Sequence, residues 1–513
     1  MATKKVYWNT IAQIGGKIST ALISIFLIKI LTNYLDLAGY GLYSKIYNYL
    51  SIFSVIADLG LYTVTVREIS AHKDDPEKVR NIAGNILTLR TGMGLAIIAL
   101  SLGMGLVLPG YDSKVALTGI LIAGIFTLFG LMNSSIMSML QAYLKTEFSF
   151  FSTTVGKIVN LLGVMAVVFV LLPKPFPVGG SFPYEDLAFT LVMIAGLLGN
   201  IVMTAMVYFY SLKVERVGFR FDPVFMKSIL KSSLPYGLAL FLNVVYFKVD
   251  VILLSILEPA ETADRVIALY GVPMKIVEVG MMFGTVFLNS MLPLFTAEIA
   301  SPKTLLPLIR KAYKLLLFFG TGIAVFIASK PAEILTFIAN KSYLEPIAGY
   351  TSADALVIVS YIFLFYFISS LFTYLLVASS HQSRLLKINA IVTVVNLVGN
   401  LIIIPYYSFV GSAIVTLACQ ILLFAQTAYA TRDIVKFDFS PKTTGAVVLG
   451  VVAAFAMMKL TDSVITRTTE HFLGNGFVAN FAELSVAAVL FTLIYAGIVF
   501  GLDRTMAKLK MSP

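Results

Sequence analysis

Long apolar runs alternate along the chain with short segments rich in charged and turn-forming residues. The apolar runs are about 17–25 residues long, the length that an α-helix needs to cross the hydrocarbon core of a bilayer. The pattern therefore predicts an all-α, polytopic membrane protein with about fourteen transmembrane helices. The predicted spans are residues 8–31, 40–65, 82–108, 115–139, 151–172, 187–211, 232–257, 266–292, 314–329, 353–378, 388–405, 411–429, 442–460 and 483–502.

Composition supports this class of protein. Of the 513 residues, 58% are hydrophobic and only 13% are charged, whereas a soluble protein has about 25% charged residues. A large water-soluble domain is therefore excluded. A single cysteine, Cys419, and three histidines in predicted loops leave no basis for a disulfide or a zinc site. We predict no metal and no cofactor.

Basic residues are unevenly distributed between alternate loops. One set of loops, which includes both termini, carries 24 Lys and Arg, and the opposite set carries 7. Because cytoplasmic loops collect Lys and Arg, we predict a multi-pass protein of the plasma membrane with both termini in the cytoplasm. The same asymmetry accounts for the net charge of +11, so we predict no nucleic-acid partner.

The loops on the predicted outer side are short, and this leaves no room for an external catalytic domain. The basic, amphipathic segment 214–235 between the sixth and seventh helices has two interpretations. It could lie on the anionic inner leaflet, or it could be an ordinary solvated loop.

The chain contains a weak internal repeat. At an offset of 230, residues 38–70 and 268–300 are identical at eight of 33 positions, among them Lys45 with Lys275 and Glu68 with Glu298. Parallel repeats of this kind enclose a cavity between two halves. We predict an N-lobe at 1–212, a basic cytoplasmic connector at 213–231, a C-lobe at 232–430, and a terminal helix pair with a cytoplasmic tail at 431–513.

Several charged residues fall inside the predicted spans. Each costs about 2.5–3.5 kcal/mol at mid-bilayer, so these side chains should face protein or water. The basic ones outnumber the acidic ones, which favours a cavity able to receive an anion. The basic residues are Lys17, Lys29, Lys45, Arg90, Lys157, Lys248 and Lys275, and the main acidic ones are Asp58, Asp250 and Glu278.

Not all of these basic residues are equally good candidates. Lys29 and Lys157 lie near helix ends, where they could line the cavity or snorkel to the interface. The predicted substrate-binding residues of the cationic cavity are Lys17, Lys45, Arg90, Lys248 and Lys275.

The two aspartates have open roles as counter-charges or sites of ion coupling. Asp58, next to Gly60, could pair with a lysine of the first helix or cap a local break in the second. Asp250 cannot share a helix face with Lys248, because residues two positions apart diverge. Its partner is expected on another helix.

No enzyme motif is present. "IGGKIST" (14–20) lacks the first glycine of a phosphate-binding loop and lies in a predicted helix, where Gly15 and Gly16 favour close helix packing. H-E-x-x-H, G-x-S-x-G and C-x-x-C are all absent from the sequence. The sequence therefore predicts a protein that is not an enzyme.

Three segments resemble one known family. "AGYGLYSKIYNYLSIFSVIADLGLYTVTVREIS" (38–70), "SSLPYGLALFLNVVYFKVDVILLS" (232–255) and "VASSHQSRLLKINAIVTVVNLVGNLIIIPYYSFVGSAIVTLACQILLF" (377–424) resemble the second, seventh and eleventh-to-twelfth helices of polysaccharide repeat-unit flippases. That family belongs to the multidrug/oligosaccharidyl-lipid/polysaccharide exporter superfamily.

The resemblance implies two six-helix lobes, alternating access and an additional terminal helix pair. It also implies cationic residues on the first, second and eighth helices, the positions of Lys17, Lys45 and Lys275. The implied substrate is a polyprenyl-diphosphate-linked oligosaccharide, moved from the cytoplasmic to the outer leaflet for cell-surface polysaccharide biosynthesis.

We therefore predict a monomeric flippase whose partners are this lipid-linked glycan, the bilayer and H⁺ or Na⁺ as coupling ion. A cation-coupled multidrug antiporter of the same architecture is the alternative, and it would need a cavity of negative charge. A membrane glycosyltransferase or polymerase would need a long outer loop, which the sequence lacks.

Overall fold

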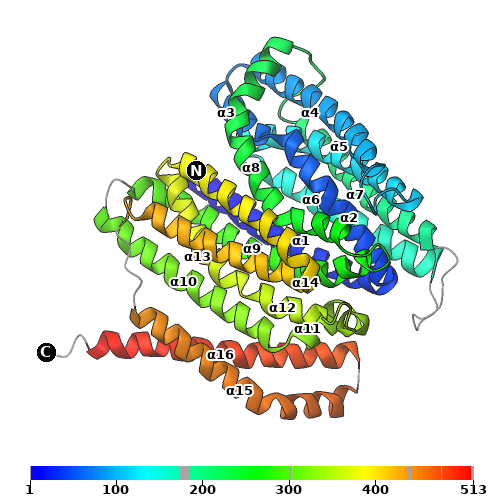
Figure 1. Cartoon of the computed structure of the whole chain (residues 1–513). Coiled ribbons are helices and arrows are strands. Elements are labelled where there is room, and N and C mark those ends of the chain that lie inside the picture. The colour runs from blue at the N-terminus through cyan, green and yellow to red at the C-terminus, as the bar shows by residue number, and fades with distance from the viewer. Residues whose placement is uncertain (1, 174–184, 300–301, 436–440, 475, 510–513) are drawn as a thin grey trace. The chain divides into compact units, whose positions relative to one another are not determined.

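The structure, a computed structural model, describes residues 2–173, 185–299, 302–435, 441–474 and 476–509. Within these ranges the helices are joined by turns and loops, and the only other regular structure is one isolated bridge between Ile347 and Tyr350, which confirms the all-α prediction (Figure 1). The helices are α1 (Ala2–Tyr34), α2 (Asp36–Asp58), α3 (Leu61–Ala71), α4 (Pro76–Gly105), α5 (Lys114–Ala142), α6 (Thr146–Ala166), the π-helix η1 (Val167–Leu171), α7 (Glu185–Ser211), α8 (Pro223–Leu257), α9 (Ala263–Glu298), α10 (Pro302–Ser329), α11 (Pro331–Ile338), the 3₁₀ turn η2 (Lys341–Leu344), α12 (Ser352–Ser360), α13 (Ile362–Ala378), α14 (Gln382–Thr431), α15 (Pro441–Leu473) and α16 (Phe477–Leu509).

Twelve helical spans in the described parts of the chain are long and apolar enough to cross a membrane. One of them, α14, kinks at Ser408, where φ of 50° and ψ of −141° leave helical geometry shortly after Pro405. A proline removes a backbone donor and bends a helix. Counting the two parts of α14 separately and adding the shorter apolar helix Ser19–Tyr34 gives the predicted number of about fourteen.

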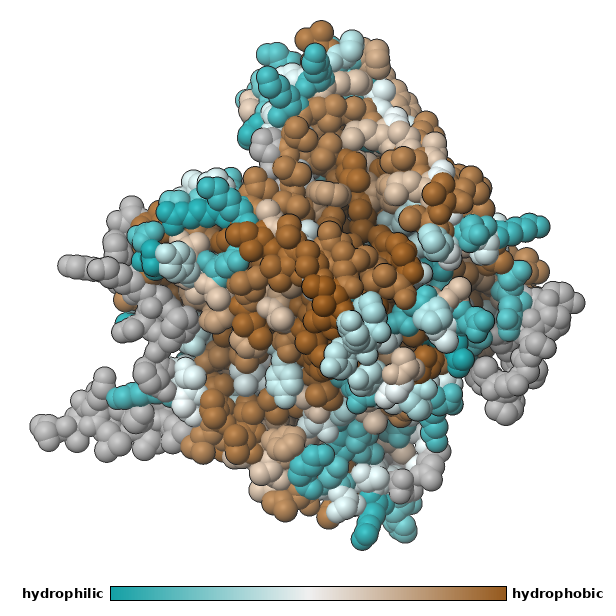
Figure 2. All heavy atoms as spheres, in the orientation of Figure 1, coloured by the Kyte–Doolittle hydropathy of each residue, from teal (hydrophilic) through white to brown (hydrophobic). Residues whose placement is uncertain are grey.

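Large apolar side chains lie on the surface of the described helices, for example Phe169 and Val170 of η1 and Phe209 of α7. Figure 2 shows apolar residues over broad areas of the visible face. In water, each Å² of this apolar surface would be unfavourable by about 25 cal/mol relative to its burial, whereas the acyl chains of a bilayer solvate it without that cost. The protein is therefore a multi-pass membrane protein.

The chain divides into two compact units, 1–268 and 269–513, with the division inside α9. In the first unit α8 packs against α2 and α3, although the predicted C-lobe begins at residue 232. The compact units thus differ from the predicted lobe limits, which are 1–212, 213–231, 232–430 and 431–513. Those limits, which follow from the repeat, remain a prediction.

Glycines set the close helix contacts of the first unit. Gly156 of α6 and Gly199 of α7 lie so close that a side chain on either would collide with the carbonyl of the other. A side chain at Gly16 of α1 would overlap the ring of Phe150 in α6, as expected of a glycine that permits close packing.

The segment that joins the sixth and seventh predicted helices lies against α4. Arg80 Nε donates to Glu215 Oε2 at 2.9 Å, and the backbone N–H of Asp222 donates to Asn85 Oδ1 at 2.6 Å. Asp222 also caps α8, with its carboxylate accepting from the backbone N–H groups of Val224 and Phe225.

In the second unit α13 packs against α10 and α14, and α15 packs against α16 and α10. Gly280 and Gly284 of α9 let Phe363 and Phe367 of α13 approach, because a side chain at either glycine would meet the ring opposite. The helix pair α15–α16 is thus joined to the rest of this unit mainly through α10 and α11.

Candidate functional site

The predicted cationic residues are spread over both units. Lys45, Arg90 and Lys248, with Asp58 and Asp250, lie in the first unit, and Lys275 lies in the second. Lys17 is on α1, but its side chain lies outside the described residues.

Arg90 and Asp58 are brought together. The guanidinium of Arg90 on α4 is fully buried, and its Nη2 donates to Asp58 Oδ1 at the end of α2. The Arg90 Nη1 also donates to Ser135 Oγ on α5 at 3.4 Å. The Asp58 side chain is 25% exposed. The positive charge of Arg90 is therefore neutralised by Asp58 within the first unit.

A helix break places the Asp58 carboxylate. α2 ends because Leu59 and Gly60 adopt left-handed backbone conformations, with φ of 39° and 74°. Gly237 of α8 packs directly on the backbone of Leu59, where any side chain would collide. Glycine at Gly60 tolerates the positive φ, whereas Leu59 is held in it by its neighbours. Asp58 thus lies at a break, one of its two predicted settings, and pairs with an arginine of α4.

Lys45 lies two turns into α2 and is only 3% exposed. Its Nζ is 2.6 Å from Asp264 Oδ1 in the first turn of α9 and donates to the carbonyl of Gly110 at 2.7 Å. The ring of Tyr111 lies 5.1 Å from the ammonium. Burial raises the pKa of the Tyr111 phenol, so this ring stays uncharged beside the lysine. In this structure the Lys45 charge is already balanced.

The other predicted residues lie on α8 and α9. Lys275 on α9 is exposed and pairs with Glu278 one turn along at 2.9 Å. Lys248 on α8 is half-buried, and Asp250 is fully buried, where its Oδ1 accepts from the backbone N–H of Val251 at 2.9 Å. The counterparts Lys45 and Lys275 of the predicted repeat therefore have different surroundings.

Sequence reasoning missed Asp264, the partner of Lys45. It stands at the start of a predicted span, where an acidic residue is common because it complements the helix dipole. Nothing in the sequence linked it to α2 or to the turn at Gly110. The only available signal was a charge beside an apolar run.

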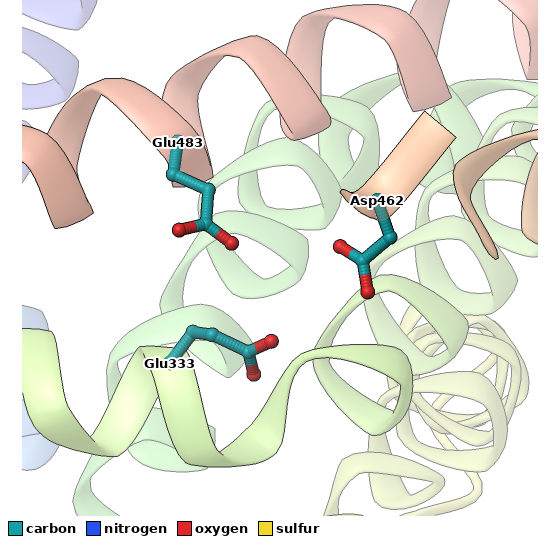
Figure 3. A group of neighbouring side chains, drawn as sticks. All are labelled: Glu333, Asp462 and Glu483. Atoms are coloured by element: carbon teal, nitrogen blue, oxygen red, sulfur yellow. The ribbon is translucent and has the colours of Figure 1, made fainter. Parts of the chain in front are cut away.

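A second ionic cluster surrounds Lys330, which directly follows the predicted span 314–329 and was not singled out from the sequence. The Lys330 side chain is 2% exposed and contacts Glu333 and Glu483 at 3.1 Å each, and Asp462 more closely. Figure 3 shows the three carboxylates pointing toward one another from α11, α15 and α16. Burial alone would lower the pKa of Lys330, but hydrogen bonds to Asp462 and the other carboxylates raise it above its ordinary value.

This cluster has the ligand type of a divalent-cation site, since one oxygen of each carboxylate lies within 4.8 Å of the others. The ammonium of Lys330 occupies their common neighbourhood, however, and serves as their cation. The arrangement ties α11, α15 and α16 to the end of α10 by charge.

Comparison of the fold with solved structures shows a clear likeness. A lipid II flippase, MurJ, in an inward closed conformation has a TM-score of 0.71 at 14% identity, covering 96% of this chain and 99% of that one. An inward-facing multidrug-resistance MATE transporter has a TM-score of 0.63 at 12% identity, covering 83% and 98%. A MOP superfamily transporter from Pyrococcus furiosus has a TM-score of 0.59 at 13% identity, covering 83% and 96%.

At these identities the likeness establishes the fold, which this chain shares with these transporters. A search of curated protein sequences found no match. The family profile described as "Polysaccharide biosynthesis protein" matches residues 4–297, more than half of the chain. The resemblance stated from the sequence is thereby confirmed, and the protein belongs to the polysaccharide biosynthesis protein family.

Proposed function

We propose that the protein is a flippase that moves a polyprenyl-diphosphate-linked oligosaccharide from the cytoplasmic to the outer leaflet by alternating access. The observation that carries this proposal is the family match over residues 4–297. It is supported by the shared fold with a protein described as a lipid II flippase over 96% of the chain.

The proposed chemistry is attraction of a diphosphate by basic side chains. Lys17, Lys248, Lys275 and Arg90 would contact the phosphates or acidic sugars, because charge-assisted hydrogen bonds to phosphate are strong. In this state two of the basic groups are already occupied. The Lys45 ammonium contacts Asp264 and Gly110, and the fully buried Arg90 guanidinium contacts Asp58. Each would have to leave its carboxylate before it could contact a phosphate. The lipid tail would remain among acyl chains.

The proposal includes a plasma-membrane location, cytoplasmic termini, a monomer, and a membrane potential or H⁺ or Na⁺ gradient as energy source. Asp58 and Asp250 are the proposed counter-charges or coupling groups. The protein transports its substrate without chemical change, and thus is not an enzyme. A cation-coupled multidrug antiporter is the second candidate, favoured by the likeness to multidrug-resistance transporters.

A reconstitution assay tests the proposal. Proteoliposomes carry a fluorescent polyprenyl-diphosphate sugar, and an impermeant quencher reports the fraction that reaches the outer leaflet. Lys248→Ala and Lys275→Ala should each slow flipping by about tenfold or more, because a hydrogen bond to a charged group contributes about 1.5–3 kcal/mol. Lys78→Ala, which changes an exposed lysine of α4 paired with Asp75, is the control and should flip normally.

The antiporter would be established instead if the wild-type protein left the labelled lipid in its original leaflet but exported a cationic dye in exchange for H⁺ or Na⁺ entering down its gradient. Normal flipping in both lysine variants would remove the cationic mechanism.

A further inference from the structure

One end of the first unit is built around Lys45. The parts that meet there are α2, the turn at residues 106–113, the end of α8 and the first turn of α9. On the predicted topology all four lie on the outer side of the membrane. The charge of Lys45 is enclosed by elements that are far apart in sequence.

The contacts at this end are close and specific. Gly41, one turn before Lys45, faces the backbone carbonyl of Asp264, where any side chain would collide. The backbone of Gly110 has φ of 78°, a conformation suited to glycine, and its carbonyl accepts from the ammonium. The close approach of α2 to the start of α9 therefore requires Gly41, and Gly110 suits the turn that presents its carbonyl to Lys45.

Tyr111, which follows Gly110 in the turn, also contacts neighbouring helices. Tyr111 is fully buried, and its hydroxyl accepts from Ser255 Oγ of α8 at 3.2 Å. The centroid of the Tyr111 ring lies 4.8 Å from that of Tyr49, whose hydroxyl donates to the carbonyl of Ser101 near the C-terminal end of α4. The turn is thus held to α8 and α2 at the same time as it accepts from Lys45.

The two members of the ion pair differ in exposure. Lys45 is 3% exposed, whereas Asp264 is 30% exposed. Loss of the aspartate leaves a buried, unpaired ammonium, which is strongly unfavourable. Loss of the lysine leaves a carboxylate that water can still reach. The pair therefore holds the start of α9 against α2. It does so because separation would leave the buried Lys45 ammonium without its carboxylate.

We propose that the Lys45–Asp264 pair is an outer latch, which closes this end of the first unit and must separate each time the transporter opens to the outside. This proposal rests on alternating access as the proposed function. α9 begins at the latch and continues into the second unit, so the release of its first turn is the local event that opening requires. Lys45 then acts as a positioning residue and not as a phosphate ligand in the closed state.

A cysteine beneath the latch reports whether it is open. The native Cys419 is buried and is replaced by Ala, and Ser255→Cys introduces a thiol at a side chain that is 5% exposed. Right-side-out vesicles are treated with a membrane-impermeant maleimide. With the latch intact, labelling should be slow.

Asp264→Asn should speed labelling about tenfold, because it removes the counter-charge of Lys45 and favours the open state. Asp264→Glu retains the charge and should label within about twofold of the parent. Glu77→Gln breaks the exposed Arg220–Glu77 pair of the same unit and is the matched control without effect. Equal labelling in Asp264→Asn and the parent would overturn the latch, as would equal acceleration in Asp264→Glu.

A double variant tests whether the unpaired charge of Lys45 causes the faster labelling. Lys45→Met with Asp264→Asn leaves no unpaired charge, so its labelling should return toward the parent rate. Labelling of the double variant that is faster than that of Asp264→Asn alone would contradict an ionic latch. The labelling assay needs no substrate. A response of the latch without lipid flipping would reject the proposed function alone, and normal flipping without a response would reject the latch alone.

Discussion

At the scale of single residues, the guanidinium of Arg90 is a fully buried charge of the first unit. Asp58→Asn should lower the free energy of unfolding by about 3 kcal/mol, the lower end of the range for breaking a buried pair, because Asp58 is partly exposed. Thermal unfolding in detergent measures this change. Arg90→Met with Asp58→Asn should recover much of the loss, since no charge is then left unpaired.

The control for this experiment is Glu77→Gln, which breaks the exposed pair with Arg220. Exposed ion pairs contribute about 0–1 kcal/mol, so a small change is expected. A loss as large as that of Asp58→Asn would mean that burial does not set the strength of these pairs.

The sequence indicated which residues carry buried charge but not how they pair. Lys45, Arg90 and Asp58 stood out because each interrupts an apolar run. Their partners could not be identified, because Asp58–Arg90 and Lys45–Asp264 join helices whose packing is a tertiary property. The sequence of α2 did contain one local cue, since the Asp-Leu-Gly at its end predicted a possible break, and the chain does leave the helix at Leu59 and Gly60.

At the scale of elements, helix existence was predictable and helix assembly was not. The sequence predicted two spans, 388–405 and 411–429, and the structure places a kink between them at Ser408, within the continuous α14. Periodicity could not show that α8 packs on α2 and α3, because an apolar helix face fits any apolar partner. The Lys330 cluster was missed for the same reason, since its acids come from three separate helices.

The Lys330 cluster should decide how firmly α15 and α16 are attached. Lys330→Met leaves three neighbouring carboxylates without their cation, so we expect the free energy of unfolding to fall by about 3–5 kcal/mol. The cluster should hold from neutral to mildly alkaline pH, because the raised pKa keeps Lys330 charged and its contribution is lost only as the pH rises through that value.

Thermal unfolding measures this loss, and a disulfide between cysteines placed on α10 and α15 should form less efficiently in the variant. Lys459→Met is the matched control, because that lysine of α15 is exposed and lies over the ring of Phe455. If Lys330→Met unfolds like the parent, the cluster does not hold the helix pair.

At the scale of the whole molecule, orientation in the membrane follows from charge. The loops predicted to be cytoplasmic carry 24 basic residues against 7 on the other side, and each basic residue near the anionic leaflet contributes about 1 kcal/mol. Epitope tags at both termini should therefore resist protease added to intact cells and become accessible after the cells are lysed. A tag that is cleaved in intact cells would show the opposite orientation. It would move the Lys45–Asp264 latch to the cytoplasmic side, so that the proposed direction of transport would need the latch to open for substrate entry and not for release.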